Sequence, residues 1–437
     1  MTREMKNSGV EWIGNIPSEW KIRKIKNVCS IYTGNSIKDT EKNNFTDSTN
    51  AIPYIATKEI DVSSSKINYD NGMYIKRDDE NFKVAPKNST LMCIEGGSAG
   101  KKIAYLNQDV CFVNKLCCFS TKSLDDKFLY YYLKSPSFNS EFELHISGLI
   151  GGVSQGELRE FAIPVPPLPE QTRISDFLDS KVTEIDKIIS ETKASIENYK
   201  EYKQSVITEA VTKGLDKNVP MKDSGIEWIG EIPVDWRLGK IKSCVTKVGS
   251  GKTPKGGGDV YSSEGVLFLR SQNVYDTGLV LDDPTYISEE IDEEMKNTRV
   301  MDKDVLLNIT GGSIGRCCIY DKSYGKANVN QHVSIIRLKQ DIMFPEYMHY
   351  YWLSSLGKMS VNLYQTGGNR EGMSADAIKN SPIIYTSIST QKEIIAFLDS
   401  KCAEIDNIIL EKEKLITNLE EYKKSLIYEY VTGKKVV

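Results

Sequence analysis

The chain has 437 residues, enough for about two to four domains at roughly 100–200 residues each. Its 40% apolar and 27% charged residues are ordinary for a globular protein. No segment approaches the roughly 20 continuous apolar residues of a membrane span, and residues 1–6 lack the apolar core of a signal peptide. The net charge of −4 argues against a uniformly nucleic-acid-binding surface, but residues 239–258 hold five lysines and no acidic residue.

The nine cysteines include no CxxC pair with metal-binding spacing. The doublets Cys117-Cys118 and Cys317-Cys318 lie in apolar, strand-like runs, which predicts buried thiols. We therefore expect a protein of the reducing cytoplasm.

The first recognisable pattern of the chain, residues 6–17, recurs as residues 222–233. A second pattern, residues 171–181, recurs as residues 391–401 at nearly the same offset. Self-similarity of this length indicates two pseudo-equivalent halves, each a domain followed by a helical segment.

Each half opens with a domain of mixed pattern. In the first domain we predict, in order, a strand, a glycine turn and a short buried helix at residues 91–94, 96–100 and 128–133. In the second domain we predict a strand, a glycine turn, a second strand and a helix at residues 305–309, 311–315, 333–336 and 347–353. The glycine turns are interpreted as structural turns rather than phosphate cradles.

Apolar residues recur at three- and four-residue steps along residues 170–213 and 390–433, which predicts two amphipathic helices. Each stretch reaches a glycine stop only at Gly214 or Gly433, and about 44 residues give roughly 65 Å of helix. Thr390 and Glu393 suggest a capping box at the second start. A coiled coil used for dimerisation is one reading, but two matching helices in one chain favour pairing with each other. The predicted helix-pairing residues are Ile188, Tyr202, Ile408 and Tyr422.

Signatures of catalysis are missing from the sequence. The segment 249–253 imitates a nucleotide-binding P-loop, but the glycine required at position 246 is Thr246. The three histidines, His145, His332 and His349, are not spaced as metal ligands, and no base-methylating or G-x-S-x-G motif occurs. Asp282 and Asp283 are read as a solvated turn. The sequence therefore points to a binding protein.

Taken together, these motifs resemble the specificity subunit of type I restriction–modification systems. Both halves carry Gly-x-Ile-Pro-x-x-Trp, at residues 14–20 and 230–236. Residues 251–254, 311–315 and 329–332 resemble further family elements. The first half departs from the pattern at residues 34–36 and at Lys115, where glutamine is usual, and the second junction, residues 386–391, lacks the proline run of residues 164–171.

The resemblance implies an α+β fold: two mixed α/β target-recognition domains separated by two long antiparallel coiled-coil helices, with pseudo-two-fold internal duplication. The expected boundaries are 1–169 for the first domain, 170–215 for the first helix, 216–388 for the second domain and 389–437 for the second helix. The implied function is to read a bipartite double-stranded DNA target and to direct two methyltransferase subunits and the restriction subunits to it. The chain itself is then a cofactor-free, non-enzymatic cytoplasmic subunit, and S-adenosylmethionine, ATP and Mg²⁺ belong to its partners.

The DNA-reading residues are expected among polar and basic side chains near the glycine turns, since Arg and Lys suit guanine or phosphate and Asn and Gln suit adenine. The candidates are Lys101, Lys102, Asn114, Lys115 and Gln155 in the first domain, and Lys252, Lys255, Arg270, Gln272, Asn273, Arg316, Asn330, Gln331, Asn369 and Arg370 in the second. Two alternatives remain open at this point: a coiled-coil scaffold that binds only proteins, and a fused restriction enzyme or ATPase.

Overall fold

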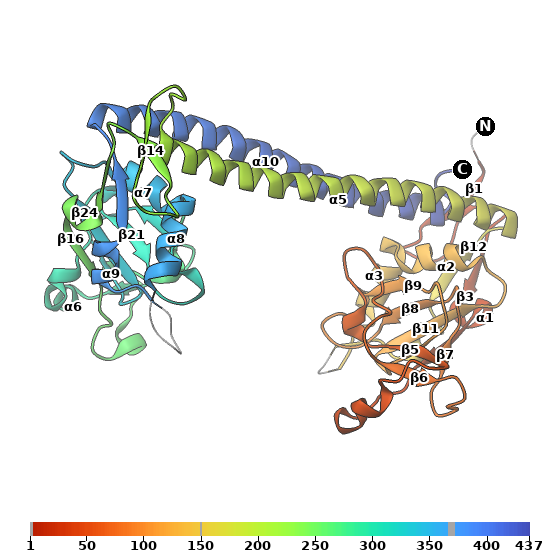
Figure 1. Cartoon of the computed structure of the whole chain (residues 1–437). Coiled ribbons are helices and arrows are strands. Elements are labelled where there is room, and N and C mark those ends of the chain that lie inside the picture. Colours follow the sequence, from red (N-terminus) through yellow and green to blue (C-terminus); the bar gives the residue numbers. More distant parts are fainter. Residues whose placement is uncertain (1–2, 149–150, 366–371) are drawn as a thin grey trace. The chain divides into compact units, whose positions relative to one another are not determined.

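The computed structural model describes residues 3–148, 151–365 and 372–437. The chain forms two compact units, Met1–Lys193 with Glu413–Val437, and Ala194–Lys412. Each unit contains one β-rich domain and a part of each of the two long helices, α5 (Leu168–Lys213) and α10 (Ile388–Val431) (Figure 1). The predicted α+β architecture with two long helices is confirmed.

The first domain contains two four-stranded sheets. One is antiparallel and has the order β4 (Cys29–Thr33), β11 (Leu116–Thr121), β8 (Thr90–Cys93), β9 (Ile103–Tyr105). The other has the order β6 (Tyr74–Lys76), β5 (Ala51–Ile55), β10 (Val110–Phe112), β7 (Val84–Ala85), with β5 and β10 parallel. The predicted strand at residues 91–94 corresponds to β8.

The second domain repeats this topology. Its antiparallel sheet has the order β16 (Val245–Ser250), β24 (Val333–Leu338), β21 (Val305–Asn308), β22 (Cys317–Ile319). Its other sheet has the order β20 (Tyr286–Ile287), β17 (Val266–Leu269), β23 (Ala327–Val329), with β17 and β23 parallel. The strands predicted at 305–309 and 333–336 are therefore confirmed.

Shorter elements also occur in matching pairs. The paired two-stranded sheets are β1 (Met5–Asn7) with β2 (Asn15–Pro17), β13 (Met221–Asp223) with β14 (Glu231–Pro233), β3 (Lys21–Lys24) with β12 (Ala162–Val165), and β15 (Arg237–Lys240) with β25 (Pro382–Tyr385). A further hairpin joins β18 (Val274–Tyr275) to β19 (Gly278–Leu279). The short helices are α1 (Ile25–Val28), α2 (Asp126–Leu133), α3 (Pro136–Leu144), α4 (Gln155–Leu158), α6 (Glu289–Glu294), α7 (Pro345–Leu353), α8 (Ser355–Tyr364) and α9 (Ala375–Asn380).

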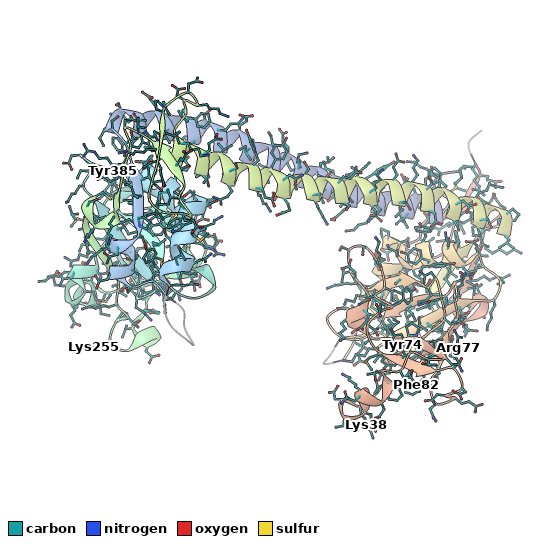
Figure 2. All side chains as sticks on the ribbon, viewed as in Figure 1. Lys38, Tyr74, Arg77, Phe82, Lys255 and Tyr385 are labelled. Carbon is teal, nitrogen blue, oxygen red and sulfur yellow. The ribbon has the colours of Figure 1, made fainter. Side chains whose placement is uncertain are left out.

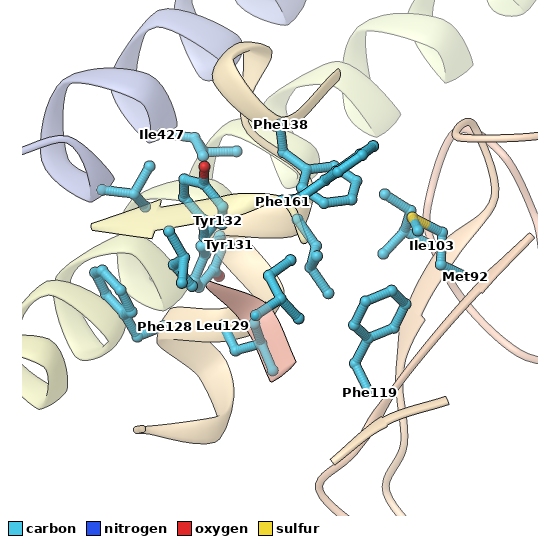
Figure 3. Close-up of a cluster of buried hydrophobic side chains, with 14 of the residues drawn as sticks. Met92, Ile103, Phe119, Phe128, Leu129, Tyr131, Tyr132, Phe138, Phe161 and Ile427 are labelled. Atoms are coloured by element: carbon cyan, nitrogen blue, oxygen red, sulfur yellow. The ribbon is translucent and has the colours of Figure 1, made fainter. Parts of the chain in front are cut away.

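The core of the first unit is continuous from sheet to long helices. Phe128 and Tyr132 of α2 and Phe119 of β11 are fully buried, and they belong to the same apolar cluster as Ile427 of α10 (Figure 3). An element with an apolar face is stable only when another element covers that face, so the domain and the long helices stabilise each other. The predicted buried helix at 128–133 forms the centre of this cluster.

A buried glutamine in each half ties the long helix to its domain. Gln171 accepts from the backbone N–H of Asp125 at 2.8 Å and donates to the carbonyl of Pro166 at 2.8 Å. Gln391 accepts from the N–H of Phe344 at 3.1 Å and donates to the carbonyl of Thr386 at 2.9 Å. The second junction therefore makes the same connection without the proline run, because the glutamine supplies it.

The ends of the long helices differ in how well the sequence predicts them. α5 ends at Lys213 and α10 at Val431, and the following Gly214 and Gly433 have φ of +79° and +70°, as the predicted glycine stops require. The start of α10 is different from the prediction. The helix begins at Ile388, and Ser387 accepts from the N–H of Thr390 at 3.2 Å, so Thr390 is inside the first turn and is not the cap.

The two long helices pair in antiparallel fashion within each unit. In the first unit, Phe177 contacts Tyr430 with ring centres 4.5 Å apart, and Asp186 pairs with Lys423 at 2.6 Å. In the second unit the equivalent pair, at an offset of 220 in both partners, is Lys203 with Asp406 at 2.7 Å. The same ion pair therefore occurs in both units, as the predicted internal duplication requires.

The residues that form the buried helix seam differ from those predicted. Ile188, Tyr202 and Tyr422 are 40%, 48% and 55% exposed, and Ile408 is half-buried. The buried positions of α5 in the first unit alternate at four and three residues instead, through Leu178, Val182, Ile185 and Ile189. Two paired helices bury one narrow stripe, and Ile188 lies about 100° around the helix from Ile189, so it faces away from the seam.

Within the three described ranges, no helix combines the length and apolarity that crossing a membrane requires.

Candidate nucleic-acid interface

In the second domain, the strand order brings four loops to one edge. In the antiparallel sheet, β16 and β21 end where β24 and β22 begin, so residues 251–255, 309–316 and 330–332 meet there. The parallel strands β17 and β23 also end at this edge, and the N–H of Asn330 donates to the carbonyl of Leu269 at 3.0 Å. Figure 2 places Lys255 at the end of the domain opposite Tyr385, the last residue of β25 beside α10. The edge therefore faces away from the helices of its own unit.

A close backbone approach fixes the first of these loops. A Cβ on Gly251 would lie 1.7 Å from the carbonyl oxygen of Val329, so only glycine fits there. Beyond it, the hydroxyl of Thr253 donates to Gln331, and a side-chain nitrogen of Gln331 lies 3.0 Å from Nε2 of His332. The other ring nitrogen of His332 lies 2.6 Å from the hydroxyl of Thr310. A chain of polar side chains thus links three loops across the edge.

Two arginines at this edge rest on aromatic rings. The guanidinium of Arg316 lies 4.8 Å from the ring centre of Tyr275, and that of Arg270 lies 5.9 Å from Tyr261. The buried Nε of Arg270 has no hydrogen-bond partner among the described residues. Such pairs orient a guanidinium through cation–π attraction.

The first domain builds the same edge with different side chains. A Cβ on Gly34 would lie 1.8 Å from the carbonyl oxygen of Phe112, and Ser36 donates to Asn114 at 2.6 Å. Gly34 matches Gly251 at an offset of 217, and strand register gives the same offset. The serine–asparagine pair therefore corresponds to Thr253–Gln331.

This register corrects one comparison made from the sequence. With an offset of 217, Asn114 corresponds to Gln331 and Lys115 corresponds to His332. The first half therefore keeps an amide where the family pattern has glutamine, and Lys115 is not its replacement. The sequence comparison is shifted by one residue because the sequence does not show the register of the strands. The close approach of a glycine to a carbonyl in each domain fixes that register.

The predicted DNA-reading residues separate into exposed side chains, of which Asn114 and Gln331 also hydrogen-bond to Ser36 and Thr253, and side chains used inside the fold. Side chains that are exposed at or near the two edges are Lys101, Asn114, Lys115, Lys252, Lys255, Gln272 and Gln331. Lys102 is half-buried and donates to the carbonyl of Thr57 at 2.7 Å. Asn369 and Arg370 lie outside the described residues.

Three candidates use their amides inside the fold. Gln155, at the start of α4, donates to the carbonyl of Ile31 at 2.6 Å. Asn273 is buried, accepting from the N–H of Arg270 at 3.0 Å and donating to a carbonyl. Asn330 is buried and accepts from the N–H of His332 at 3.0 Å. These amides satisfy backbone groups of the fold, and a sequence cannot distinguish them from amides that face a ligand.

Five residues of the two loop edges were not among the predicted DNA-reading candidates: Ser36, Thr253, His332, Tyr261 and Tyr275. A signal was present for two of them, because Thr253 and His332 stand inside segments that resemble family elements. The tyrosines carry no such signal, since an arginine 9 or 41 residues away in sequence becomes their neighbour only through folding.

The structure supports two interpretations made from the sequence: the cysteine thiols are buried, and residues 249–253 do not form a nucleotide-binding P-loop. All nine cysteines are buried, and burial raises the pKa of the Cys117 and Cys317 thiols well above the ordinary value. Within the described ranges no group of His, Cys, Asp or Glu side chains is arranged to hold a metal ion. Residues 249–253 leave a strand and are followed by a short 3₁₀ turn at 257–260, not by the α-helix of a nucleotide-binding loop.

Comparison with known proteins agrees with this duplicated architecture. The model of the type I restriction modification DNA specificity domain matches residues 17–198 and again residues 233–421. The chain is 25% identical to the specificity subunit of the type I restriction enzyme EcoBI of Escherichia coli, over 99% of this chain and 90% of that protein. It is 24% identical to the MjaVIII specificity subunit of Methanocaldococcus jannaschii, over 96% and 93%.

Solved structures with the same fold include a chain from a study of complex assembly and conformational transition of the type I R-M system. That chain has a TM-score of 0.75 and 15% identity, with 96% of this chain and 99% of that one covered. The HsdS subunit from Thermoanaerobacter tengcongensis has a TM-score of 0.52 and 16% identity, with coverages of 96% and 98%. Two matched domains, each followed by a long helix, exclude a scaffold that consists of a coiled coil alone. The chain therefore belongs to the type I restriction–modification DNA-specificity family.

Proposed function

We propose that each domain reads one half of a bipartite double-stranded DNA target with the loop edge described above. The observation that carries the proposal is the duplicated edge itself: a glycine pressed against a carbonyl, followed by a hydroxyl–amide pair, occurs in both domains. The side chains around it differ between the domains. A shared frame with different polar side chains is what two readers of different half-sites require.

The exposed candidates supply the contacts in this proposal. Exposed lysines such as Lys101, Lys115, Lys252 and Lys255 suit phosphates, and the amides of Asn114 and Gln331 suit adenine. Gln155, Asn273 and Asn330 have structural roles and are left out of the contact set.

Partner subunits complete the activity. We propose that two methyltransferase subunits dock on exposed apolar side chains of the long helices, including Ile188, Tyr202 and Tyr422. These subunits bring S-adenosylmethionine, and restriction subunits bring ATP and Mg²⁺. The chain is then a non-catalytic, cytoplasmic subunit that chooses the site.

The proposal is tested by mapping methylated sites in cells that express the full chain with its methyltransferase subunits. We expect a motif of two specified half-sites around an unspecified gap. Replacing residues 20–165 by the same region of a relative should change one half-site only. A swap that altered both half-sites, or neither, would contradict independent reading.

A second test concerns catalysis. The purified chain, incubated with labelled S-adenosylmethionine and DNA, should transfer no methyl group, and transfer should begin when methyltransferase subunits are added. The matched control is the same mixture without the chain. Methyl transfer by the chain alone would contradict a non-catalytic subunit.

A further inference from the structure

The arginines of the second domain fall into two classes. Arg299 pairs with Asp292 and Glu293, and Arg337 pairs with Asp304, so carboxylates occupy both guanidinium groups. Arg237, Arg270 and Arg316 make no ion pair with any residue in the described part of the chain, and Arg270 and Arg316 lie over Tyr261 and Tyr275. The Nε of Arg270 is buried, which leaves Arg316 as the loop-edge arginine with the fuller set of accessible donors. We infer that Arg316 is the side chain with which the second domain reads a guanine, through N7 and O6 in the major groove. The inference rests on the proposed DNA-reading function of this edge.

The backbone of Arg316 is held in place by the glycine turn. The N–H of Arg316 donates to the carbonyl of Ser313 at 3.1 Å, and its carbonyl accepts from the N–H of Asn308 at 2.8 Å. The N–H of Gly315, at φ +88°, donates to the carbonyl of Asn308 at 2.8 Å. A side chain that begins from a fixed backbone loses less freedom on binding, which favours specific readout.

Asn308 also fixes the tyrosine against the arginine. Its side chain is fully buried and donates to the carbonyl of Ser271 at 2.8 Å and to the hydroxyl of Ser313 at 3.2 Å. It thereby joins the glycine turn to the segment that leads to Tyr275. On the other side, the N–H of Cys317 donates to Asp276 at 3.0 Å. Tyr275 and Arg316 are thus held together from both flanks.

The resulting geometry suits guanine better than phosphate. The guanidinium carbon lies 4.8 Å from the centre of the phenol ring, and no described residue accepts a hydrogen bond from the guanidinium nitrogens. A fork of parallel donors matches the two acceptors of guanine. A phosphate needs only a nearby positive charge, which the flexible Lys252 and Lys255 supply at the same edge.

The described part of the first domain has no counterpart of the arginine that Asn308 and the glycine turn hold over Tyr275. Asn308 is replaced there by Cys93, at the offset of 215 that relates the two glycine turns. Arg316 corresponds to Lys101 in the turn and to Lys102 in the strand pairing, because the N–H of Cys93 donates to the carbonyl of Lys102. The arginines between residues 1 and 169 are Arg3, Arg23, Arg77 and Arg159, and none lies in the edge loops 34–36, 94–102 or 113–115. Lysine is a point charge and cannot form the fork. The guanine read by Arg316 therefore belongs to the half-site of the second domain.

The test uses the full chain bound to its methyltransferase subunits and a duplex with its mapped target. Each guanine of the second half-site is replaced in turn by 7-deazaguanine, which lacks the N7 acceptor. We expect one replacement to weaken binding by roughly 10- to 100-fold. Arg316→Lys should lose about as much on the native duplex and nothing further on the modified one. Arg237→Lys, an exposed arginine on β15 near the helices, is the matched control and should bind like the wild type.

Three results would overturn the inference: a second half-site without guanine, no coupling between Arg316→Lys and any modified guanine, or equal weakening on specific and non-specific DNA. Equal weakening would identify a phosphate contact. Failure of the proposed function looks different, because the wild-type complex would then prefer no sequence at all. Unchanged thermal unfolding of Arg316→Lys shows that the comparison concerns binding and not folding.

Discussion

Replacing Ile189 with aspartate is expected to lower the free energy of unfolding of the first unit by about 3 kcal/mol or more. Ile189 is 7% exposed and belongs to the core cluster that joins α5, α10 and the first domain. An aspartate there either buries an unpaired charge or forces the helix pair apart. The measurement is urea-induced unfolding of the full chain followed by far-UV and near-UV circular dichroism.

The control is the neighbouring residue. Ile188→Asp places the same charge on the exposed side of the same helical turn, and we expect it to change stability by less than about 0.5 kcal/mol. It should instead weaken capture of methyltransferase subunits, since Ile188 is part of the proposed docking surface. Equal destabilisation by both variants would contradict the heptad seam through Leu178, Val182, Ile185 and Ile189.

Gly251→Ala is expected to abolish recognition by the second domain and to destabilise its unit by about 3 kcal/mol. The added Cβ would lie 1.7 Å from the carbonyl oxygen of Val329, so β16 and β23 must separate at the edge. The separation breaks the hydrogen bond from the N–H of Lys252 to that carbonyl and moves Thr253 away from Gln331. Thermal unfolding and sequencing of methylated sites are the measurements.

A glycine two residues earlier provides the comparison. A Cβ on Gly249 would meet nothing within 4 Å, so Gly249→Ala should leave both stability and site choice intact. Gly34→Ala should disable the first domain as Gly251→Ala disables the second, because its Cβ would lie 1.8 Å from the carbonyl oxygen of Phe112. If Gly251→Ala kept wild-type unfolding and methylated the same sites, the glycine contact would not organise the edge.

The sequence by itself determined the plan of this protein. Duplication of residues 6–17 and 171–181 identified two equivalent halves, and uninterrupted apolar periodicity identified α5 and α10 with their glycine ends. The repeat and the apolar periodicity involve residues that are close in sequence or recur at a constant spacing, so they can be recognised from the sequence alone. The family likewise followed from ordered motifs, since each motif keeps its spacing in both halves.

Only the tertiary structure decided which side chains are buried, which are exposed and which contact one another. Ile188 and Ile189 are alike in sequence, and the partner helix alone determines which of them is buried. Asn330 and Gln331 are neighbours, yet the first satisfies the backbone and the second faces outward. The pairing of Arg316 with Tyr275 joins residues 41 positions apart in sequence. Each of these outcomes depends on a contact between distant segments, and such contacts exist only after the chain has closed its loops.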